Sequence, residues 1–327
     1  MEKRKLGNSD LEITPIGFGA WAIGGGDYAF GWGQQDDADS IAAMEHAVDS
    51  GINWIDTAPV YGLGHSEKIV AQALQNLGSS RRPYVFTKCS LVWDESREVT
   101  HSLKSASLRR EVEESLSRLG TDVIDLYQIH WARFSPDLPD DDLEEGWQTL
   151  VDLKKEGKLR NIGVSNFDVA QLKRASAIEV PTSLQPPYSA MRRNIEKEIL
   201  PYCEKNNIGT IVYSPMQSGL LSGKMTRERI AAFPDDDFRS RSAEYKEPKL
   251  TASLELADRF TDIGSRHGLS AAEIAIAWTL RLPSVTAAIV GIRNTKQVDG
   301  IIGAGTFRLS DAELAEIEGQ IGAAAKV

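Results

Sequence analysis

The sequence predicts an α/β protein with a single (β/α)8 TIM barrel, an N-terminal β-hairpin and extra C-terminal helices. Three observations predict this fold. Short β-rich runs alternate with amphipathic helical stretches, which indicates a parallel sheet with right-handed crossovers. Eight such units follow one another without a change of character, which favours a closed barrel over an open sheet. The 327 residues suit one barrel with insertions. Because no Pro/Ser/Gly-rich linker divides them, residues 1–327 are expected to form one domain.

The chain is expected to begin with a β-hairpin, made by residues 4–6 and 11–13 around a turn at 7–10. The eight barrel strands then follow as short apolar runs. They are expected at residues 16–18, 52–55, 84–87, 123–129, 161–164, 182–184, 210–213 and 287–290. The run at 123–129 breaks the alternation of apolar and polar residues, as a strand buried on both faces would.

The connecting helices are recognised by apolar residues that recur on one helical face. In the unit after residues 52–55, the Ser66 hydroxyl is placed to cap the helix and Gly78 supplies its stop. Further helices are expected around residues 108–119, 147–153, 169–172, 195–203 and 271–280. The stretch 216–249 is rich in Gly, Arg, Asp and Pro and is the longest irregular segment. In a compact fold, a loop of this length indicates a binding loop or lid.

Composition excludes several classes of function. The formal net charge of −10 argues against broad binding of nucleic acid or anionic membranes, which needs a basic surface. No stretch approaches ~18 consecutive apolar residues, and the N-terminus does not resemble a signal peptide, so no membrane span is expected. Cys89 and Cys203 lie far apart, and no set of His, Cys and carboxylates has the spacing of metal ligands. We therefore expect no metal and a cytoplasmic protein with reduced thiols.

Four residues with definite chemistry stand at or near the ends of neighbouring strands. Asp56, Lys88 and His130 end the second, third and fourth expected strands, and Tyr61 follows Asp56 in the short loop DTAPVYG. The C-terminal ends of barrel strands surround the active site, so these side chains are expected to meet in space. Each residue alone is explained as well by a turn, a solvated lysine or plain packing. Only their joint placement favours a catalytic role.

The chemistry of that set points to carbonyl reduction. A free phenol titrates near pH ~10, and the ammonium of Lys88 is expected to lower the pKa of Tyr61. Asp56 would keep the ammonium charged, and His130 would polarise and orient a carbonyl oxygen. The result is a general acid aimed at a carbonyl, with donors that stabilise the alkoxide that develops as hydride arrives.

These segments resemble the aldo-keto reductase superfamily across nearly the whole chain. The run IDTAPVYGLGHSE is similar to the first signature of that family, and PYVFTKC and DLYQIHW supply its lysine and histidine. The segments GVSNF and GIRNTKQV complete the match. The resemblance implies a single aldo-keto reductase-like barrel domain that reversibly reduces an aldehyde or ketone, with hydride from a nicotinamide and a proton from Tyr61. The implied catalytic residues are Tyr61, Lys88, Asp56 and His130.

The resemblance also implies where a nicotinamide cofactor lies. Ser165, Asn166 and Gln185 would bind the carboxamide, and Tyr213 would stack on the nicotinamide ring, as a flat aromatic side chain can. The segment SPMQSGLLSGK would lie under the pyrophosphate, where backbone amides and a lysine can meet phosphate charge. The residues expected there are Ser214, Gly219, Leu220, Leu221 and Lys224.

The segment GIRNTKQVDG would hold the adenosine end of the cofactor. Arg293 is the expected contact of the 2′-phosphate, and Gln297 that of the adenine. The segment departs from the commonest family pattern, because Gly291 stands where other members carry a lysine. Gly300 and Ile301 stand where many members carry a glutamate and an asparagine that contact adenine. NADP(H) is favoured as the cofactor over NAD(H), and the selectivity between them stays open.

The substrate is expected to depend on four loops, at residues 24–35, 91–102, 131–142 and 216–249. Tryptophans that occupy or follow strand ends are candidates for an apolar wall around a small-molecule carbonyl substrate, with plain loop packing as the alternative. They are Trp21, Trp32, Trp93 and Trp131. The loop at 131–142 carries four aspartates, which disfavours anionic substrates. They are Asp137, Asp140, Asp141 and Asp142.

Two other functions compete with the reductase. The first is a redox-sensing auxiliary module that keeps the barrel and cofactor but acts through a partner, with little turnover. The chain shows no extended N-terminal arm or interaction tail, which weighs against it. The second is a different barrel enzyme, such as an isomerase of a phosphorylated sugar, which would bind no nicotinamide. The oligomeric state is open.

Overall fold

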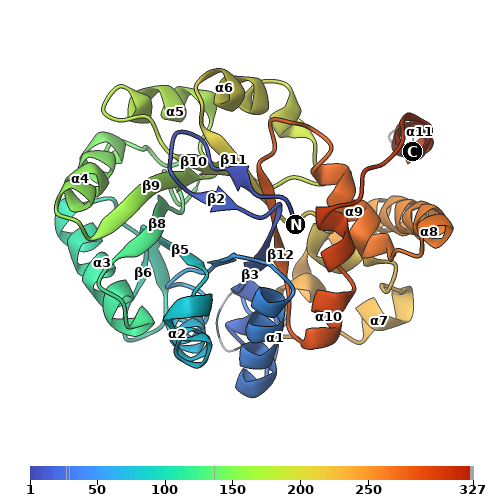
Figure 1. Cartoon of the computed structure of the whole chain (residues 1–327), viewed down its shortest axis with the longest axis horizontal. Coiled ribbons are helices and arrows are strands. Elements are labelled where there is room, and N and C mark those ends of the chain that lie inside the picture. The colour runs from blue at the N-terminus through green and yellow to red at the C-terminus, as the bar shows by residue number, and fades with distance from the viewer. Residues whose placement is uncertain (27, 29, 136, 325–327) are drawn as a thin grey trace.

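Eight parallel strands close into a barrel in the order β10-β11-β12-β3-β4-β5-β8-β9. The computed structural model describes residues 1–26, 28, 30–135 and 137–324. Residues 27, 29 and 136, which fall in two of the loops expected to determine the substrate, and residues 325–327 of the expected domain lie outside the described residues. Figure 1 shows the ring of strands with the helices packed around it. The predicted (β/α)8 barrel is confirmed.

Each barrel strand overlaps a strand expected from the sequence. The strands are β3 (Ile16–Gly19), β4 (Trp54–Asp56), β5 (Tyr84–Cys89), β8 (Ile124–Ile129), β9 (Leu159–Ser165), β10 (Ser183–Gln185), β11 (Gly209–Tyr213) and β12 (Ala287–Gly291). Every residue of β3, β4, β8 and β10 is buried. Burial of both faces explains why these strands are apolar runs rather than alternating ones.

A hairpin closes one end of the barrel, as expected. Strand β1 (Arg4–Lys5) pairs antiparallel with β2 (Glu12–Ile13). Leu6, Leu11 and Ile13 are buried in one apolar cluster with side chains from the barrel strands, including Trp54 and Phe86. In Figure 1 the dark blue hairpin lies across the ring of strands. Because the N-terminal end is covered, ligands are expected at the opposite end, where the strands finish.

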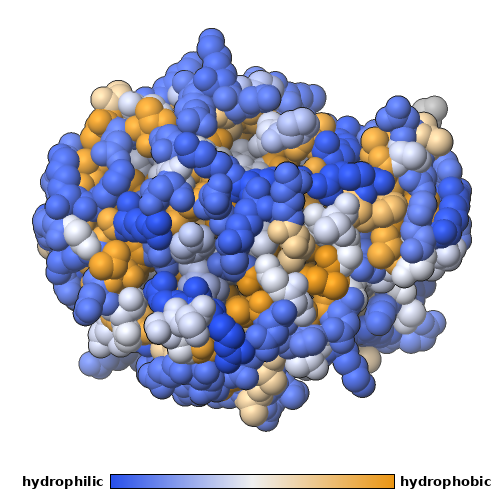
Figure 2. All heavy atoms as spheres, viewed as in Figure 1, coloured by the Kyte–Doolittle hydropathy of each residue, from blue (hydrophilic) through white to orange (hydrophobic). Residues whose placement is uncertain are grey.

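Helices surround the barrel. They are α1 (Asp37–Asp49), α2 (His65–Leu77), α3 (Ser105–Leu119), α4 (Leu143–Lys155), α5 (Val169–Ser176), α6 (Ile199–Lys205), α7 (Arg227–Ala231), α8 (Lys249–His267), α9 (Ala271–Thr279), α10 (Thr295–Asp299) and α11 (Asp311–Ala324). Helices α10 and α11 follow the last strand, so the extra C-terminal helices are confirmed. In Figure 2 hydrophilic residues cover most of this face, and apolar residues show between them.

The expected cap of α2 is wrong. The residue at the cap position is Gly64, whose backbone has φ 95°, and no side chain caps the helix. Glycine adopts this left-handed conformation without strain. The Ser66 hydroxyl donates instead to the carbonyl of Ala20 at 3.0 Å and lies 2.9 Å from the Thr57 hydroxyl. Ser66 therefore ties α2 to the segments that follow β3 and β4.

The stretch 216–249 is folded, not irregular as expected. It contains α7 and the 3₁₀ turns Gln217–Ser222, Phe238–Arg241 and Ala243–Tyr245. Several of its side chains form an apolar cluster of their own, with Leu220, Met225, Tyr245 and Leu250 buried in it. The stretch also meets the loop after β3, because the Phe238 amide donates to the Gly31 carbonyl at 3.1 Å. Turn-forming composition concealed these short helices in the sequence.

Candidate active site

The structure brings Asp56, Lys88 and Tyr61 together. Asp56 is the last residue of β4, and Lys88 lies near the end of the adjacent β5, so both side chains stand at the same rim of the barrel. The Lys88 Nζ donates to Asp56 Oδ1 at 2.6 Å, to the Thr57 carbonyl at 3.0 Å and to the Tyr61 hydroxyl at 3.3 Å. The Asp56 Oδ2 accepts from Gln185 Nε2 at 2.8 Å. The buried ammonium and carboxylate are thus both satisfied.

His130 completes the group. It follows β8, and its backbone amide donates to the Cys89 carbonyl at 3.1 Å. Its ring lies edge-on to Tyr61, with 5.9 Å between the ring centroids and an interplanar angle of 82°. The Asn166 side chain donates to the His130 carbonyl at 3.0 Å and so fixes the chain there. All four residues expected to be catalytic therefore lie within one group, and their roles stay a prediction.

The pKa values of this group differ from the expectation at one point. Burial and the Asp56 carboxylate raise the pKa of Tyr61 well above its usual value, although Lys88 was expected to lower it. The reason is that Asp56 balances the ammonium charge at shorter range than the phenol. Burial lowers the pKa of Lys88, against the opposing effect of Asp56. Burial and the Lys88 ammonium hold the pKa of His130 well below its usual value. At neutral pH the phenol is therefore protonated and the imidazole neutral.

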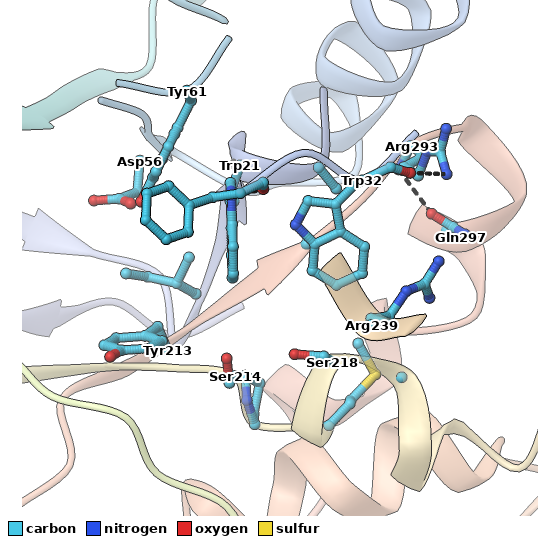
Figure 3. Close-up of a pocket in the computed structure, with 18 of the residues that line it drawn as sticks. Trp21, Trp32, Asp56, Tyr61, Tyr213, Ser214, Ser218, Arg239, Arg293 and Gln297 are labelled. Carbon is cyan, nitrogen blue, oxygen red and sulfur yellow. Dashed lines mark hydrogen bonds between the residues drawn. The ribbon is translucent and has the colours of Figure 1, made fainter. Parts of the chain in front are cut away.

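A cavity of about 750 Å³ opens at this group. That volume is in the range of small-molecule and cofactor sites, ~300–1,000 Å³. Figure 3 looks into it, with Asp56, Tyr61 and Tyr213 at one end and Arg293 and Gln297 at the other. The cavity is therefore elongated, with its catalytic candidates at one end and a cationic group at the other.

The residues expected around a nicotinamide hold one another. Ser165, Gln185 and Tyr213 are the last residues of β9, β10 and β11. The Ser165 hydroxyl donates to the Gln185 carbonyl at 2.8 Å, and the Tyr213 hydroxyl donates to Asn166 Oδ1 at 2.9 Å. Asn166, Gln185 and Tyr213 line the cavity, whereas Ser165 is buried and bonded to Asn166 Nδ2 at 3.0 Å. Three of the four are thus positioned to contact a ligand.

The segment after β11 has an unusual backbone. Ser214, Gln217, Ser218 and Gly219 all have positive φ, between 47° and 98°. Such turns can gather polar backbone groups around an anion. The amides of Gly219 and Leu221, however, both donate to the Met216 carbonyl, at 3.0 and 3.1 Å. Both amides are thus hydrogen-bonded within the chain, and their contact with phosphate stays a prediction.

The side chains of this segment divide between the cavity and the core. Ser214, Gly219 and Lys224 line the cavity, as do Ser218 and Ser222, which the sequence did not single out. The side chains of Leu220 and Leu221 are fully buried in apolar clusters and do not line it. Side-chain hydroxyls and the Lys224 ammonium thus border the cavity along this segment.

Arg293 holds a loop over the far end of the cavity. Its backbone amide donates to Gln297 Oε1 at 2.7 Å, as dashed in Figure 3. Its guanidinium donates to Gln35 Oε1 at 2.5 Å and also bonds the Gln34 carbonyl. Burial and a second guanidinium, that of Arg239, lower the pKa of Arg293. The expected phosphate contact is therefore also a structural tie.

The sequence also singled out other residues at the end of the cavity that contains Arg293. Gly291, Gln297, Gly300 and Ile301 all line the cavity. A Cβ at Gly291 would meet nothing within 4 Å, so the glycine leaves open space where a longer side chain would stand. The glycine therefore leaves this end of the cavity wider without straining the backbone.

Sequence reasoning missed Arg239. Its guanidinium pairs with the Asp237 carboxylate through Nε at 2.9 Å and Nη2 at 2.5 Å, and lies 4.7 Å from the Trp32 ring centroid. It lines the cavity although it is nearly buried. No motif marked it, because only the folding of the stretch 216–249 brings it beside Arg293.

Three of the four expected tryptophans line the cavity. They are Trp21, Trp32 and Trp131. Trp21 stacks on Tyr61 at 6.2 Å between centroids and meets Trp32 edge-on at 5.3 Å. The expectation for Trp93 is wrong, because it lies in the strand β6 (Leu91–Trp93), paired with β7 (Val99–His101), and Leu91 reaches the cavity in its place.

Within residues 1–26, 28, 30–135 and 137–324, no group of three or more His, Cys, Asp and Glu side chains is arranged to hold a metal ion. In the same residues, no helix is both long and apolar enough to cross a membrane.

Known proteins resemble this chain in sequence and in fold. Residues 15–321 match the model of the Aldo/keto reductase family. The chain is 37% identical over 302 residues to "Aldo-keto reductase YhdN" of Bacillus subtilis, covering 92% of this chain and 88% of that protein. It is 33% identical over 323 residues to the "NADH-specific methylglyoxal reductase" of Escherichia coli, covering 96% of each. The solved structure of a glycerol dehydrogenase of Gluconobacter oxydans superposes with a TM-score of 0.87 at 35% identity, over 100% of this chain and 97% of that one.

Proposed function

Because the chain belongs to the aldo/keto reductase family of NAD(P)H-dependent oxidoreductases, we propose that it reversibly reduces a small aldehyde or ketone, with Tyr61 as the proton donor. The observation that carries this proposal is the contact of Lys88 Nζ with both Asp56 Oδ1 at 2.6 Å and the Tyr61 hydroxyl at 3.3 Å. The contact lies at the end of an elongated cavity of cofactor size.

The residues of the site divide the proton chemistry between them. Tyr61 keeps its proton at neutral pH and can give it to a carbonyl oxygen as negative charge grows there. The Lys88 ammonium then stabilises the phenolate that remains, and Asp56 holds the ammonium in place. The neutral imidazole of His130 has one N–H with which to orient the oxygen. A reduced nicotinamide, when bound, supplies the hydride.

The lining of the cavity fits such a cofactor. Asn166 and Gln185 offer amide groups that suit the carboxamide, and Tyr213 offers a flat ring. Ser214 and Lys224 line the part of the cavity that is expected to hold the pyrophosphate. These are the residues we assign to cofactor binding, together with the cationic end of the cavity.

We further propose a preference for NADPH over NADH. Arg239 and Arg293 lie close enough for the charge of one to lower the pKa of the other, and both line the adenosine end. Two adjacent guanidinium groups are suited to a phosphate dianion. The E. coli relative is named as NADH-specific, so the two arginines alone support the preference. Cys89 and Cys203 are buried free thiols, which supports a reducing, cytoplasmic location.

One experiment tests the proposal as a whole. The protein is mixed with NADPH or NADH and a panel of methylglyoxal, glyceraldehyde, aromatic aldehydes and simple sugars, and the absorbance of the reduced nicotinamide is followed. We expect turnover of at least one carbonyl, faster with NADPH. Tight cofactor binding with negligible turnover of every carbonyl would instead support the auxiliary module. No binding of either cofactor would support a different barrel enzyme.

A further inference from the structure

A smaller cavity of about 150 Å³ adjoins the mouth of the site. Trp131, Phe134 and Asn166 line both this side chamber and the main cavity. The other residues that line it include Arg133 and Gln171. Since a water molecule takes up about 30 Å³ in the liquid, the chamber has room for a small polar group. The chamber therefore adjoins the main cavity and shares part of its wall.

Arg133 has no hydrogen-bond or ion-pair partner in the described part of the chain. It is half-buried in the chamber, yet none of the described residues gives its guanidinium a hydrogen bond, an ion pair or a ring contact. Arg174, on the nearby helix α5, differs in this respect, since it donates four hydrogen bonds to Asp140 and Glu144. The N–H donors of the Arg133 guanidinium are therefore free for an anionic ligand.

The carboxylate of Asp140 is satisfied by other residues. Gln171 Nε2 donates to it at 2.7 Å, and the Arg174 guanidinium donates to it at 2.7 Å. Burial raises the pKa of Asp140, but hydrogen bonds from Gln171 and Arg174 outweigh it and lower that pKa, and the charge of Arg133 adds only a small lowering effect. Asp140 therefore does not occupy the hydrogen-bonding groups of Arg133.

Two further carboxylates near the chamber are also engaged. Asp168, which lines it, accepts from the Gln171 amide at 2.8 Å as the cap of α5. Asp142 pairs with Lys104 at 2.6 Å. Asp140, Asp142 and Asp168 are thus hydrogen-bonded by other residues, whereas the Arg133 guanidinium is not.

We propose that Arg133 binds an anionic group, a carboxylate or a phosphate, at the far end of the carbonyl substrate. The body of such a substrate lies against the rings of Trp131 and Phe134, which are 39% and 44% exposed at the mouth. The preferred substrate class is thus an aldehyde or ketone with a negative charge remote from the reacting carbon. This inference rests on the proposed reductase function.

Matched substrate pairs test it. The kcat/KM is measured for 4-formylbenzoate against 4-formylbenzamide, and for glyceraldehyde 3-phosphate against glyceraldehyde. We expect the charged member of at least one pair to be preferred about tenfold, mainly through KM, since a hydrogen bond between charged groups is stronger than one between neutral groups. The pair that shows the preference distinguishes carboxylate from phosphate. Arg133→Gln should abolish the preference and leave the neutral aldehydes unaffected, and Arg133→Lys should keep part of it.

Arg110→Gln is the matched control. Arg110 lies on α3, its side chain is 63% exposed, and it does not line either cavity. This variant removes the same charge and should keep the preference. Equal rates for charged and neutral members of both pairs in the unaltered protein would overturn the inference. So would a loss in Arg133→Gln that is the same for charged and neutral substrates.

A binding measurement separates this inference from the proposed function. Quenching of tryptophan fluorescence reports on ligand binding, because Trp131 borders the chamber and Trp21 and Trp32 line the main cavity. Tighter binding of 4-formylbenzoate than of 4-formylbenzamide, lost in Arg133→Gln, would support the anion site even if no carbonyl were turned over. Turnover without any charge preference in binding or rate would support the reductase and refute the anion site.

Discussion

The Lys88 ammonium lies 3.3 Å from the Tyr61 hydroxyl, yet the pKa of that phenol is raised. The ammonium is closer to Asp56, at 2.6 Å, and the pair is nearly neutral when seen from Tyr61. Burial then dominates, because it penalises the charged phenolate. The site is thus built to hold a proton on Tyr61 until negative charge appears on a substrate oxygen.

Replacing Tyr61 tests the identity of the proton donor. Tyr61→Phe removes one hydroxyl and leaves the ring that packs on Trp21. We expect kcat for carbonyl reduction to fall by about 10²–10⁴, the usual contribution of a general acid, with the Kd of the cofactor unchanged. Tyr84→Phe is the matched control. Tyr84 begins β5, at the end of the strand away from Lys88, and the variant should keep full activity. An undiminished rate in Tyr61→Phe would assign the proton to another group.

The pH dependence follows from the same pKa shifts. Reduction needs the protonated phenol of Tyr61 and is favoured below its raised pKa, so kcat should stay flat up to about pH 10, the usual tyrosine value. His130, whose pKa is lowered, stays neutral down to below about pH 6.5. Oxidation of the alcohol needs the phenolate, so its rate should rise with pH across the same range. A reduction rate that declines between pH 7 and 9 would contradict the raised pKa.

The buried pair of Lys88 and Asp56 makes a prediction about stability. Lys88→Met leaves the Asp56 carboxylate buried without its cation, which typically costs about 3–5 kcal/mol of unfolding free energy. The double variant Lys88→Met/Asp56→Asn removes both charges and should recover most of that loss. Neither variant should regain the rate of reduction. Urea unfolding and steady-state kinetics on the same samples measure the two effects, and an equally unstable double variant would refute the charge explanation.

The positions of barrel residues could be predicted from the sequence, because strand ends have a fixed place in the fold. Asp56, Gln185 and Tyr213 end three of the apolar runs, and the closed barrel brings them to one rim. The predicted cluster of Asp56, Tyr61, Lys88 and His130 depended on this geometry alone. The hairpin was predictable for a different reason, because turn residues separate two short β-rich runs.

The contributions of loops could not be predicted, because their shape is set by tertiary contacts. Arg239 and Arg133 come from loops and carry no periodic signal, whereas Trp93, placed by its distance from a strand end, belongs to a separate two-stranded ribbon. The pKa of Tyr61 was also out of reach, because it depends on burial and on the exact partner of Lys88. Sequence patterns report which side chains reach the rim, but not how they share charge.

The adenosine end makes a prediction about cofactor selectivity. Arg239→Gln should weaken NADPH binding about tenfold to hundredfold, the value of one or two charged hydrogen bonds, and NADH binding by less than about twofold. Arg293→Ala should weaken NADPH far more than NADH as well. Since Arg293 also holds the loop through Gln35, some loss with NADH is expected there. Arg227→Gln, on α7 and outside the cavity lining, is the control.

Fluorescence titration of each variant with both cofactors measures this selectivity. The ratio of the two Kd values, not either value alone, reports on the 2′-phosphate. Equal losses of NADPH and NADH affinity in both Arg239→Gln and Arg293→Ala would refute a phosphate role for this end and leave only the structural tie.

Glu111 makes a prediction about stability and pH. Its buried carboxylate accepts from the Ser90 amide at 2.8 Å and from the Ser107 hydroxyl at 2.9 Å, and burial raises its pKa to about 7. The folded state therefore binds a proton that the unfolded state has released, between about pH 4.5 and 7. Across that window the folded protein loses stability as pH rises, by as much as roughly 3 kcal/mol at 1.36 kcal/mol per pH unit.

Glu111→Gln removes this titration while it keeps an acceptor for Ser90. The unfolding free energy of the unaltered protein, measured in urea at several pH values, should fall relative to that of Glu111→Gln as pH rises from 4.5 to 7. Glu113→Gln, an exposed change on the same helix, is the control. The difference in unfolding free energy between the unaltered protein and Glu113→Gln should stay constant with pH. A difference between the two proteins that does not vary with pH would show that Glu111 is ionised throughout. The Ser90 backbone, held at φ 82° directly after β5, would then be fixed by a full negative charge.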